Sequence, residues 1–320
     1  MIVLFTDFGE VGPYVGQVKA VLERDAPGIP VIDLLHDAPM FQARASSYLL
    51  ASLIDVFPAN VVFLCVVDPG VGSSRAPAIV SADGRRFVGP DNGLFEIVMR
   101  RANERSFRRI TWEPKDMSAS FHGRDLFAPV AARLAKGDDV ASELRPEEEA
   151  RRPHWPNDLK EIIYLDKFGN AMTGLRAKNV PAGSEMIVNG HRLTRARTFS
   201  DLPEGSAFWY ENSSGLVEFA VNQGGAKAAL GVDVGSEFSI DTAQGAASAV
   251  FSSTGRDRCP PFQNGNHQTT IWTSSWAILF LLLSPLAQCC SPGCPRAGSA
   301  AVSALSGCWR SRRSRRRCRQ

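Results

Sequence analysis

The first 240 residues of this 320-residue chain contain almost no cysteine: only Cys65 lies there, and the other six lie in the last 80 residues. One thiol cannot form a disulfide framework, and Cys65 stands in an apolar run over 61–67, as a small buried hydrophobe does. Residues 1–240 therefore suit a reducing compartment, and we expect a cytoplasmic protein. Residues 1–5 lack the positive charge and the length of a secretory signal and indicate a first strand instead.

The chain also lacks a strong excess of either charge over its first 240 residues. The formal net charge is +3, but residues 241–320 hold ten Arg, no Lys and two Asp, a net charge of +8. The other 26 basic and 31 acidic residues give residues 1–240 a net charge of −5, which offers no electrostatic reason to bind nucleic acid. The one apolar stretch of the last 80 residues, 276–283, is far shorter than the about 20 residues that span a bilayer, so we expect no membrane partner.

Paired metal ligands are missing as well. The five histidines show no His-x-x-x-His spacing, and Cys290 and Cys294 have no histidine at zinc-finger distance. Gly70 and Gly72 lie in a glycine-rich run, but neither Gly-x-Gly-x-x-Gly nor Gly-Lys-Ser/Thr is present, so the pattern favours a turn over a phosphate-binding loop. We expect neither a metal nor a cofactor.

What the first 140 residues do contain is an alternation of short β-branched runs and amphipathic segments. This alternation is typical of an α/β domain with a largely parallel sheet. We predict strands over 2–5, 31–34, 61–67, 78–80 and 87–88. We predict helices over 14–24, 43–56 and 125–134, and a further helix that begins near 91–93.

The composition changes after residue 145. Residues 146–159 contain prolines and many charges but no apolar face, which predicts a linker. Short strands separated by Gly- and Asn-rich turns follow, at 161–166, 171–175, 186–188, 207–211 and 216–221. We therefore predict an N-terminal α/β catalytic domain over 1–145 and a smaller all-β, barrel-like domain over 160–242.

Residues 243–320 differ from both predicted domains. They are rich in Ser, Arg, Cys and Pro and show neither helical nor strand periodicity. We expect an atypical, disordered tail, with a C-terminal membrane anchor flanked by basic residues as the alternative.

Polar residues that directly follow apolar runs are the first candidates for a site, because ligands of α/β sheets bind beyond the carboxyl ends of the strands. Asp7 and Phe8 follow the first predicted strand, and Asp68 follows the third. Arg75 lies in the same loop as Asp68, and His122 lies just before the fourth helix. Such a set can bind and deprotonate a water: Arg stabilises hydroxide, His can accept a proton, and Asp can orient either. The structural alternative is a turn cap, a surface ion pair and a helix-start histidine.

Two turns of the second domain hold further candidates. Asp166, Phe168 and Asn170 lie in one turn, and Asn212 and Ser213 lie in the other. These residue types are common in turns for structural reasons. They also suit a nucleoside with an amino-acid end, because an aromatic ring can stack on a base, an amide can bind a base edge and a carboxylate can pair with an ammonium group.

Several motifs occur in a fixed order over about residues 1–240. They are Thr6-Asp7-Phe8-Gly9, Tyr14-Val15-Gly16 with Lys19, Asp33-Leu34-Leu35-His36, Val67-Asp68-Pro69-Gly70-Val71-Gly72 with Arg75, Gly89-Pro90-Asp91-Asn92-Gly93, Phe121-His122-Gly123-Arg124-Asp125, Asp166-x-Phe168-Gly169-Asn170 and Asn212-Ser213-Ser214-Gly215. In this order they resemble the S-adenosyl-L-methionine (SAM) hydroxide adenosyltransferases, or SAM hydrolases, which are relatives of fluorinase and chlorinase.

The resemblance implies a fold and a reaction. The family has an N-terminal α/β domain and a C-terminal barrel-like domain, and it assembles as a homotrimer with SAM at the subunit interface. Water, as hydroxide, attacks the ribose C5′ and displaces methionine, so SAM is the substrate and adenosine is a product. The alternatives are a halide-using relative of the same fold and a non-catalytic module that binds SAM or adenosine.

The resemblance also implies roles for individual residues. Asp68, Arg75 and His122 would activate the water. The substrate-binding residues would be Asp7, Phe8, Asp166, Phe168, Asn170, Asn212 and Ser213, with Asp7 on the ribose hydroxyls, Phe168 and Asn170 on the adenine side, and Asp166 and Ser213 at the methionine end. The chain departs from the family pattern at Gly12, where an acid is common and for which Glu10 is a candidate substitute, and in its tail, which matches no part of that pattern.

Overall fold

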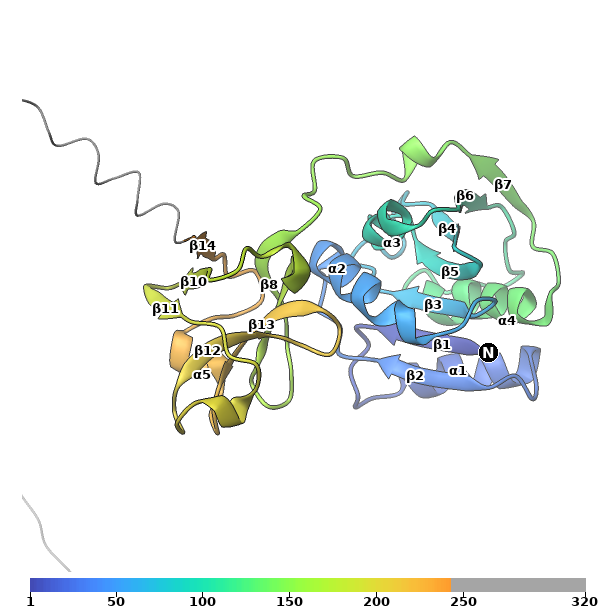
Figure 1. The fold of residues 1–320 in the computed structure, drawn as a ribbon. Coiled ribbons are helices and arrows are strands. Elements are labelled where there is room, and N and C mark those ends of the chain that lie inside the picture. Colours follow the sequence, from blue (N-terminus) through green and yellow to red (C-terminus); the bar gives the residue numbers. More distant parts are fainter. Residues whose placement is uncertain (243–320) are drawn as a thin grey trace, which may run out of the picture. The chain divides into compact units, whose positions relative to one another are not determined.

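The computed structural model of the chain describes residues 1–242; the predicted tail over 243–320 lies outside the described residues. A seven-stranded sheet forms the centre of the N-terminal part, in the order β2-β1-β3-β5-β4-β6-β7 (Figure 1). Its strands are β1 (Ile2–Thr6), β2 (Val31–Leu35), β3 (Val62–Val66), β4 (Pro77–Ala82), β5 (Arg85–Pro90), β6 (Arg105–Ile110) and β7 (Ser142–Arg145). β2, β1, β3 and β5 run parallel, whereas β4, β6 and β7 pair antiparallel with their neighbours. The sequence predicts a largely parallel sheet, and the structure shows parallel pairing only among β2, β1, β3 and β5.

Burial explains which strands the sequence reveals. β1 and β3 are buried along their whole length, and strands buried on both faces appear as unbroken apolar runs. β6 and β7 escape prediction because charged residues interrupt them, and only Phe107 and Ile110 of these two strands are buried.

Two pairs of helices cover the two faces of the sheet. α1 (Tyr14–Asp25) and α4 (Ala128–Lys136) share a hydrophobic core with one face, and α2 (Ala43–Leu53) and α3 (Glu96–Arg101) share a second core with the other. Cys65 lies in the second core without exposed surface, as predicted.

The helix boundaries differ from the predicted ones for local reasons. The helix predicted over 43–56 ends at Leu53 and continues as a short 3-10 turn, η1 (Ile54–Val56). The helix predicted from 91–93 begins only at Glu96, because Gly93 adopts a φ of +99° that a helix does not allow. A π-helical turn, η2 (Gly123–Phe127), precedes α4.

The segment predicted as a linker, 146–159, is bound to the N-terminal part. It contains a 3-10 turn, η3 (Glu147–Glu149). The buried Glu96 carboxylate of α3 accepts hydrogen bonds from Arg151 at 3.1 and 3.2 Å. Trp155 packs against the core between α2, α3 and the sheet. The segment was predicted to have no apolar face to bury, but Ala150 and Leu159 belong to this core and Trp155 packs against it.

Two antiparallel sheets form the C-terminal part. The four-stranded sheet has the order β12-β13-β9-β8 and the three-stranded sheet the order β11-β10-β14. Their strands are β8 (Leu159–Leu165), β9 (Ala171–Arg176), β10 (Glu185–Val188), β11 (His191–Leu193), β12 (Ala207–Glu211), β13 (Leu216–Val221) and β14 (Ser239–Asp241). The shorter elements are η4 (Ala177–Asn179), η5 (Phe199–Asp201) and α5 (Ala226–Leu230). Both sheets contribute to one core, and no helix within residues 1–242 is long and apolar enough to cross a membrane.

Candidate active site

The structure brings Asp68, Arg75 and His122 into direct contact. Arg75 Nε donates to the two carboxylate oxygens of Asp68 at 2.9 and 3.0 Å, and Arg75 Nη2 donates to Asp68 Oδ2 at 2.5 Å. The same Nη2 lies 2.8 Å from His122 Nδ1. The side chains of Arg75 and Asp68 are only 10% and 5% exposed, so Arg75 is not a surface ion pair. A carboxylate, a guanidinium and an imidazole thus form one continuous polar group.

The contact with Arg75 fixes the hydrogen-bonding role of His122. A guanidinium has no lone pair to offer, so His122 Nδ1 must be the acceptor and the proton of the neutral ring lies on Nε2. Burial lowers the pKa of His122 and the Arg75 charge lowers it further, against the opposing effects of Asp68 and Asp125. The ring is therefore neutral at pH 7 and can donate from Nε2. The expectation that His122 accepts a proton does not fit this arrangement, because Arg75 already occupies its lone pair.

Neighbouring parallel strands position the two acids of the N-terminal part. Asp7 and Asp68 follow β1 and β3, and these strands pair in parallel, so their carboxyl ends meet at one edge of the sheet. Asn92 Nδ2 donates to Val67 O at 2.8 Å and Asn92 Oδ1 accepts from Leu94 N at 3.2 Å. Asn92 therefore fixes the backbone directly before Asp68. It belongs to a motif that the sequence singles out, but its positioning role emerges only from these contacts.

Two glycines let the loops of this site approach each other. Gly72 has a φ of +77°, and a Cβ there would lie 2.7 Å from the carbonyl oxygen of Ala119, in the segment that leads to His122. A Cβ on Gly123 would lie 2.8 Å from the Phe8 ring. Larger residues at either position would push the loop of Arg75 or Phe8 away from His122.

Asp7 and Phe8 lie at the same edge but contact different neighbours. Asp7 Oδ2 accepts from the backbone N–H of Phe41 at 3.2 Å. Burial raises the pKa of Asp7, and the Asp68 charge adds a smaller rise, which places the two acids within electrostatic reach of each other. Phe8 packs on Phe121 and Tyr14 with ring centroids 5.6 and 6.2 Å apart. Within residues 1–242, Glu10 forms no side-chain hydrogen bond or ion pair with this group, and a Cβ placed on Gly12 would meet no atom within 4 Å.

The candidates of the C-terminal part line a separate pocket of about 750 Å³. The predicted residues that line it are Asp166, Phe168, Asn170, Asn212 and Ser213. The Phe168 ring is 80% exposed, so it is available for stacking. Asp7, Asp68, Arg75 and His122 do not line this pocket, so the fold of one chain keeps the two sets of candidates apart.

Asp166 holds its own turn in place. Its Oδ1 accepts from the backbone N–H groups of Phe168 and Asn170 at 2.9 and 2.8 Å, and its Oδ2 accepts from Asn170 Nδ2 at 3.0 Å. These contacts present Phe168 to solvent and orient the Asn170 amide. Asp166 Oδ2 keeps a lone pair for a cationic ligand.

Among the lining residues outside the predicted set, Glu218 and Tyr210 form a hydrogen-bonded group with Asn212. Glu218 is only 2% exposed; it accepts from Tyr210 Oη at 2.5 Å and from Asn212 Nδ2 at 2.7 Å. Asn212 Oδ1 in turn accepts the N–H groups of Ser214 and Leu216, each at 3.0 Å. Burial raises the pKa of Glu218, and its two hydrogen bonds oppose that rise. The signal in the sequence was a single acid inside the apolar strand β13.

Comparisons with known proteins show which family the chain is similar to. Family models described as the SAM hydroxide adenosyltransferase N-terminal domain and C-terminal domain match residues 2–143 and 160–239. The chain is 41% identical over 246 residues to an (R)-S-adenosyl-L-methionine hydrolase of Thermus thermophilus, covering 72% of this chain and 95% of that protein. It is 36% identical over 252 residues to a protein of the same name from Salinispora arenicola, with coverages of 73% and 95%.

More distant relatives and solved structures extend the comparison. A fluorinase of Nocardia brasiliensis is 23% identical over 272 residues, covering 69% of this chain and 90% of that protein. The crystal structure of an uncharacterized conserved protein from Thermotoga maritima matches with a TM-score of 0.68 and 32% identity, over 75% of this chain and 100% of the other. The predicted fold class, an α/β domain with a smaller all-β part, is confirmed.

Proposed function

The chain belongs to the SAM hydroxide adenosyltransferase family, and we propose that it hydrolyses SAM to adenosine and L-methionine at the group formed by Asp68, Arg75 and His122. The observation that carries this proposal is the bridge that Arg75 makes between the Asp68 carboxylate and His122 Nδ1. It joins the three residues for which the family resemblance implies water activation.

The chemistry of this group suits a bound water. The Arg75 guanidinium lies beside it as a permanent cation that stabilises hydroxide relative to water, and His122 Nε2 can donate a hydrogen bond to the same oxygen. Asp68 accepts the proton through lone pairs that Arg75 leaves free. The hydroxide oxygen then forms a bond to the ribose C5′ as the C5′–S bond breaks, and the electron pair stays on sulfur.

The leaving group explains why no further catalyst is needed. A sulfonium departs as a neutral thioether, so it requires no general acid, and the reaction balances with water and SAM alone. We therefore propose that the enzyme needs neither a metal nor a cofactor. What remains for the protein is to orient hydroxide and C5′ in line, which can contribute about 7–11 kcal/mol.

The separation of the two candidate sets supports a site shared between chains. We propose that a homotrimer brings Asp7, Asp68, Arg75 and His122 of one subunit against the pocket of Phe168 and Asn212 on its neighbour. Asp7 would hold the ribose hydroxyls, Phe168 would stack on adenine, and Asp166 and Ser213 would bind the methionine end. A reducing cytoplasmic location is supported by Cys65, the single and buried thiol of residues 1–240.

Isotope labelling tests the reaction. In water enriched in ¹⁸O, SAM should yield methionine and adenosine in equal amounts, with one ¹⁸O atom at the 5′ position of adenosine. Formation of a 5′-halo-adenosine in chloride or fluoride buffer would show the halide-using alternative. Binding of SAM without release of methionine would show a non-catalytic module.

Mixing two variants tests the shared site, with activity assayed at a SAM concentration far below its KM. Asp68→Asn removes the proton acceptor of the N-terminal set, and Asn212→Ala weakens SAM binding by the C-terminal pocket, so each variant alone has little activity under these conditions. In trimers formed at random from equal amounts of both, one interface in four would combine two intact halves, so about a quarter of the parent activity should return. Activity that stays absent, in a mixture shown to exchange subunits, would rule out the shared site.

A further inference from the structure

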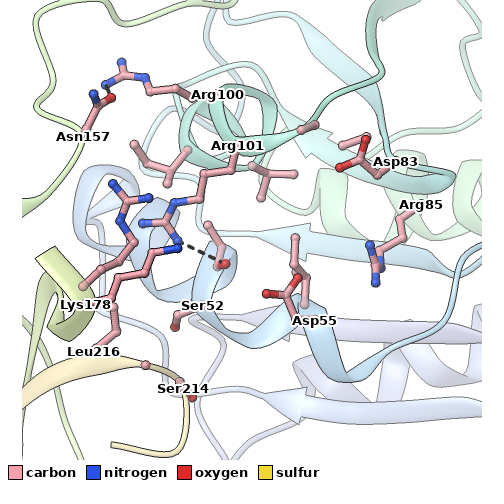
Figure 2. Close-up of a pocket in the computed structure, with 18 of the residues that line it drawn as sticks. Ser52, Asp55, Asp83, Arg85, Arg100, Arg101, Asn157, Lys178, Ser214 and Leu216 are labelled. Carbon is pink, nitrogen blue, oxygen red and sulfur yellow. Dashed lines mark hydrogen bonds between the residues drawn. The ribbon is translucent and has the colours of Figure 1, made fainter. Parts of the chain in front are cut away.

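A second cavity, of about 540 Å³, lies where α2 and α3 meet β9, η4 and the segment before β13 (Figure 2). None of the predicted site residues lines it. Its charged lining consists of the cations Arg85, Arg100, Arg101, Arg176 and Lys178 and the acids Asp55, Asp83 and Glu211. The cavity therefore carries an excess of positive charge in a protein part whose net charge is −5.

Most of these charges are already paired within the protein. Arg100 binds the buried Glu96, Arg176 binds Asp158 at 2.7 and 2.8 Å, and Glu211 pairs with Arg195. Asp83 Oδ1 accepts two backbone N–H groups. Arg85 forms no ion pair within residues 1–242, but its guanidinium donates to Phe57 O at 3.1 and 2.6 Å. Arg101 and Lys178 also form no ion pair in that part of the chain, and their hydrogen bonding is less complete.

Arg101 is the more unusual of the two. Its Nη1 donates to Ala51 O at 3.3 Å, but its buried Nη2 has no acceptor in the described part of the chain. Burial lowers the pKa of Arg101, the Arg176 charge lowers it further, and Asp158 and Asp55 act in the opposite direction. A desolvated cation without a partner destabilises a fold, so an oxygen acceptor at this point would be strongly favourable.

The remaining charges are divided across the cavity. Lys178 lies on the same side as Arg101, whereas Asp55, Asp83 and Arg85 lie on the opposite side (Figure 2). The Lys178 side chain is exposed and flexible, so its ammonium group can adjust to a ligand at little cost. Arg101 offers a planar fork of donors and Lys178 a mobile point charge, which is the combination that binds tetrahedral oxyanions.

We propose that this cavity binds an oxyanion of the phosphate class between Arg101 and Lys178, at a site distinct from the SAM site. Ile54, Ile97 and Leu216 line the cavity as well, and its volume exceeds that of a phosphate group, so a small phosphate ester fits the same site. Arg101 belongs to α3 and Lys178 to η4, so the bound anion links the N-terminal and C-terminal parts.

Thermal unfolding and calorimetric titration of the full chain test this site. Inorganic phosphate at about five times its Kd should raise the Tm by about 2–4 °C relative to sodium chloride of equal ionic strength. Arg101→Gln and Lys178→Gln should each weaken phosphate binding by about tenfold or more, because each removes a charged donor. Lys160→Gln is the matched control: it removes the same charge from an exposed position outside the cavity and should keep the full response.

The proposal fails if phosphate neither raises the Tm of the parent nor binds in the titration. It also fails if Lys178→Gln binds phosphate as tightly as the parent, a result that stays interpretable even if Arg101→Gln does not fold. A comparison with glycerol 3-phosphate identifies the source of the anion: tighter binding than phosphate indicates a phosphate ester, and equal binding indicates the phosphate group alone. None of these measurements depends on SAM hydrolysis.

Discussion

The two sets of candidate residues are held in place in opposite ways. In the N-terminal part, Asp68 and Arg75 of one loop pair with each other, and Arg75 also contacts His122, which lies 47 residues further along the chain. In the C-terminal pocket, Asp166 and Asn212 bind backbone groups two to four residues away. The N-terminal set therefore depends on tertiary structure, whereas the C-terminal set is largely made by its own turns. Substitutions in the first should abolish chemistry, and substitutions in the second should weaken binding.

The largest effect is expected from Arg75→Ala. This change removes the cation beside the proposed water and leaves the Asp68 carboxylate buried without its partner. We expect kcat for SAM hydrolysis to fall by about 10²- to 10³-fold, with a much smaller change in SAM affinity. Arg24→Ala is the control, because Arg24 is exposed at the end of α1 and pairs with the adjacent Asp25. Equal losses in kcat and in affinity would assign Arg75 to binding rather than to water activation.

A smaller effect, on KM and not on kcat, is expected from Glu218→Gln. In Glu218 one carboxylate oxygen accepts from Tyr210 and the other from Asn212, and Gln replaces one of these oxygens by an NH2 donor. One of the two bonds is therefore lost or reversed, and the turn that carries Ser213 is held less firmly. We expect KM for SAM to rise by about tenfold while kcat changes little. Glu211→Gln changes an exposed acid on the neighbouring strand and should leave both constants unchanged. A loss confined to kcat would contradict the division between the two sets.

The pH dependence of stability should have opposite signs in the two sets. The pKa of His122 is lowered below its usual 6.5, so the unfolded chain binds more protons between that lowered value and 6.5, and its contribution to stability is lost as the pH falls through this window. The pKa of Glu218 is raised above 4.5, so its contribution is lost as the pH rises from 4.5 through the raised value.

Unfolding of variants across pH measures both contributions. Relative to the parent, His122→Asn should lose less stability on acidification from pH 7.5, and Glu218→Gln should lose less on going from pH 4.5 to 7.5. Parallel curves for parent and variant would show that the corresponding group does not contribute to the pH dependence of stability.

The smallest effect is expected from deletion of residues 243–320. The family match ends at residue 239, and the similar hydrolases are covered over 95% of their length by less than three quarters of this chain. We expect the truncated chain to keep the kcat and the oligomeric state of the full chain, as measured by SAM turnover and light scattering. Loss of either would assign these residues to the enzyme.

How far the sequence predicts the structure depends on how local the interactions are. The strands over 207–211 and 216–221 were predicted to the residue, because alternating apolar positions and tight turns define them. The placement of Asp7 and Asp68 at one edge of the sheet was also predictable, because each follows an apolar strand. The role of His122 was not, because it depends on which nitrogen meets Arg75. Glu218 was missed because a single acid in an apolar strand does not show its partners.

The contacts that attach residues 146–159 to the N-terminal part affect how the protein unfolds. Glu96 ties residues 151 and 152 to α3 through one buried carboxylate, and Leu159, Ile163 and Leu216 of the C-terminal part share a core with α2 and β3 of the N-terminal part. Separation of the halves would expose that common core, and release of residues 151 and 152 would leave the buried Glu96 carboxylate with Arg100 alone among these partners. The two halves are therefore one cooperative folding unit, and residues 1–242 should melt in a single calorimetric transition.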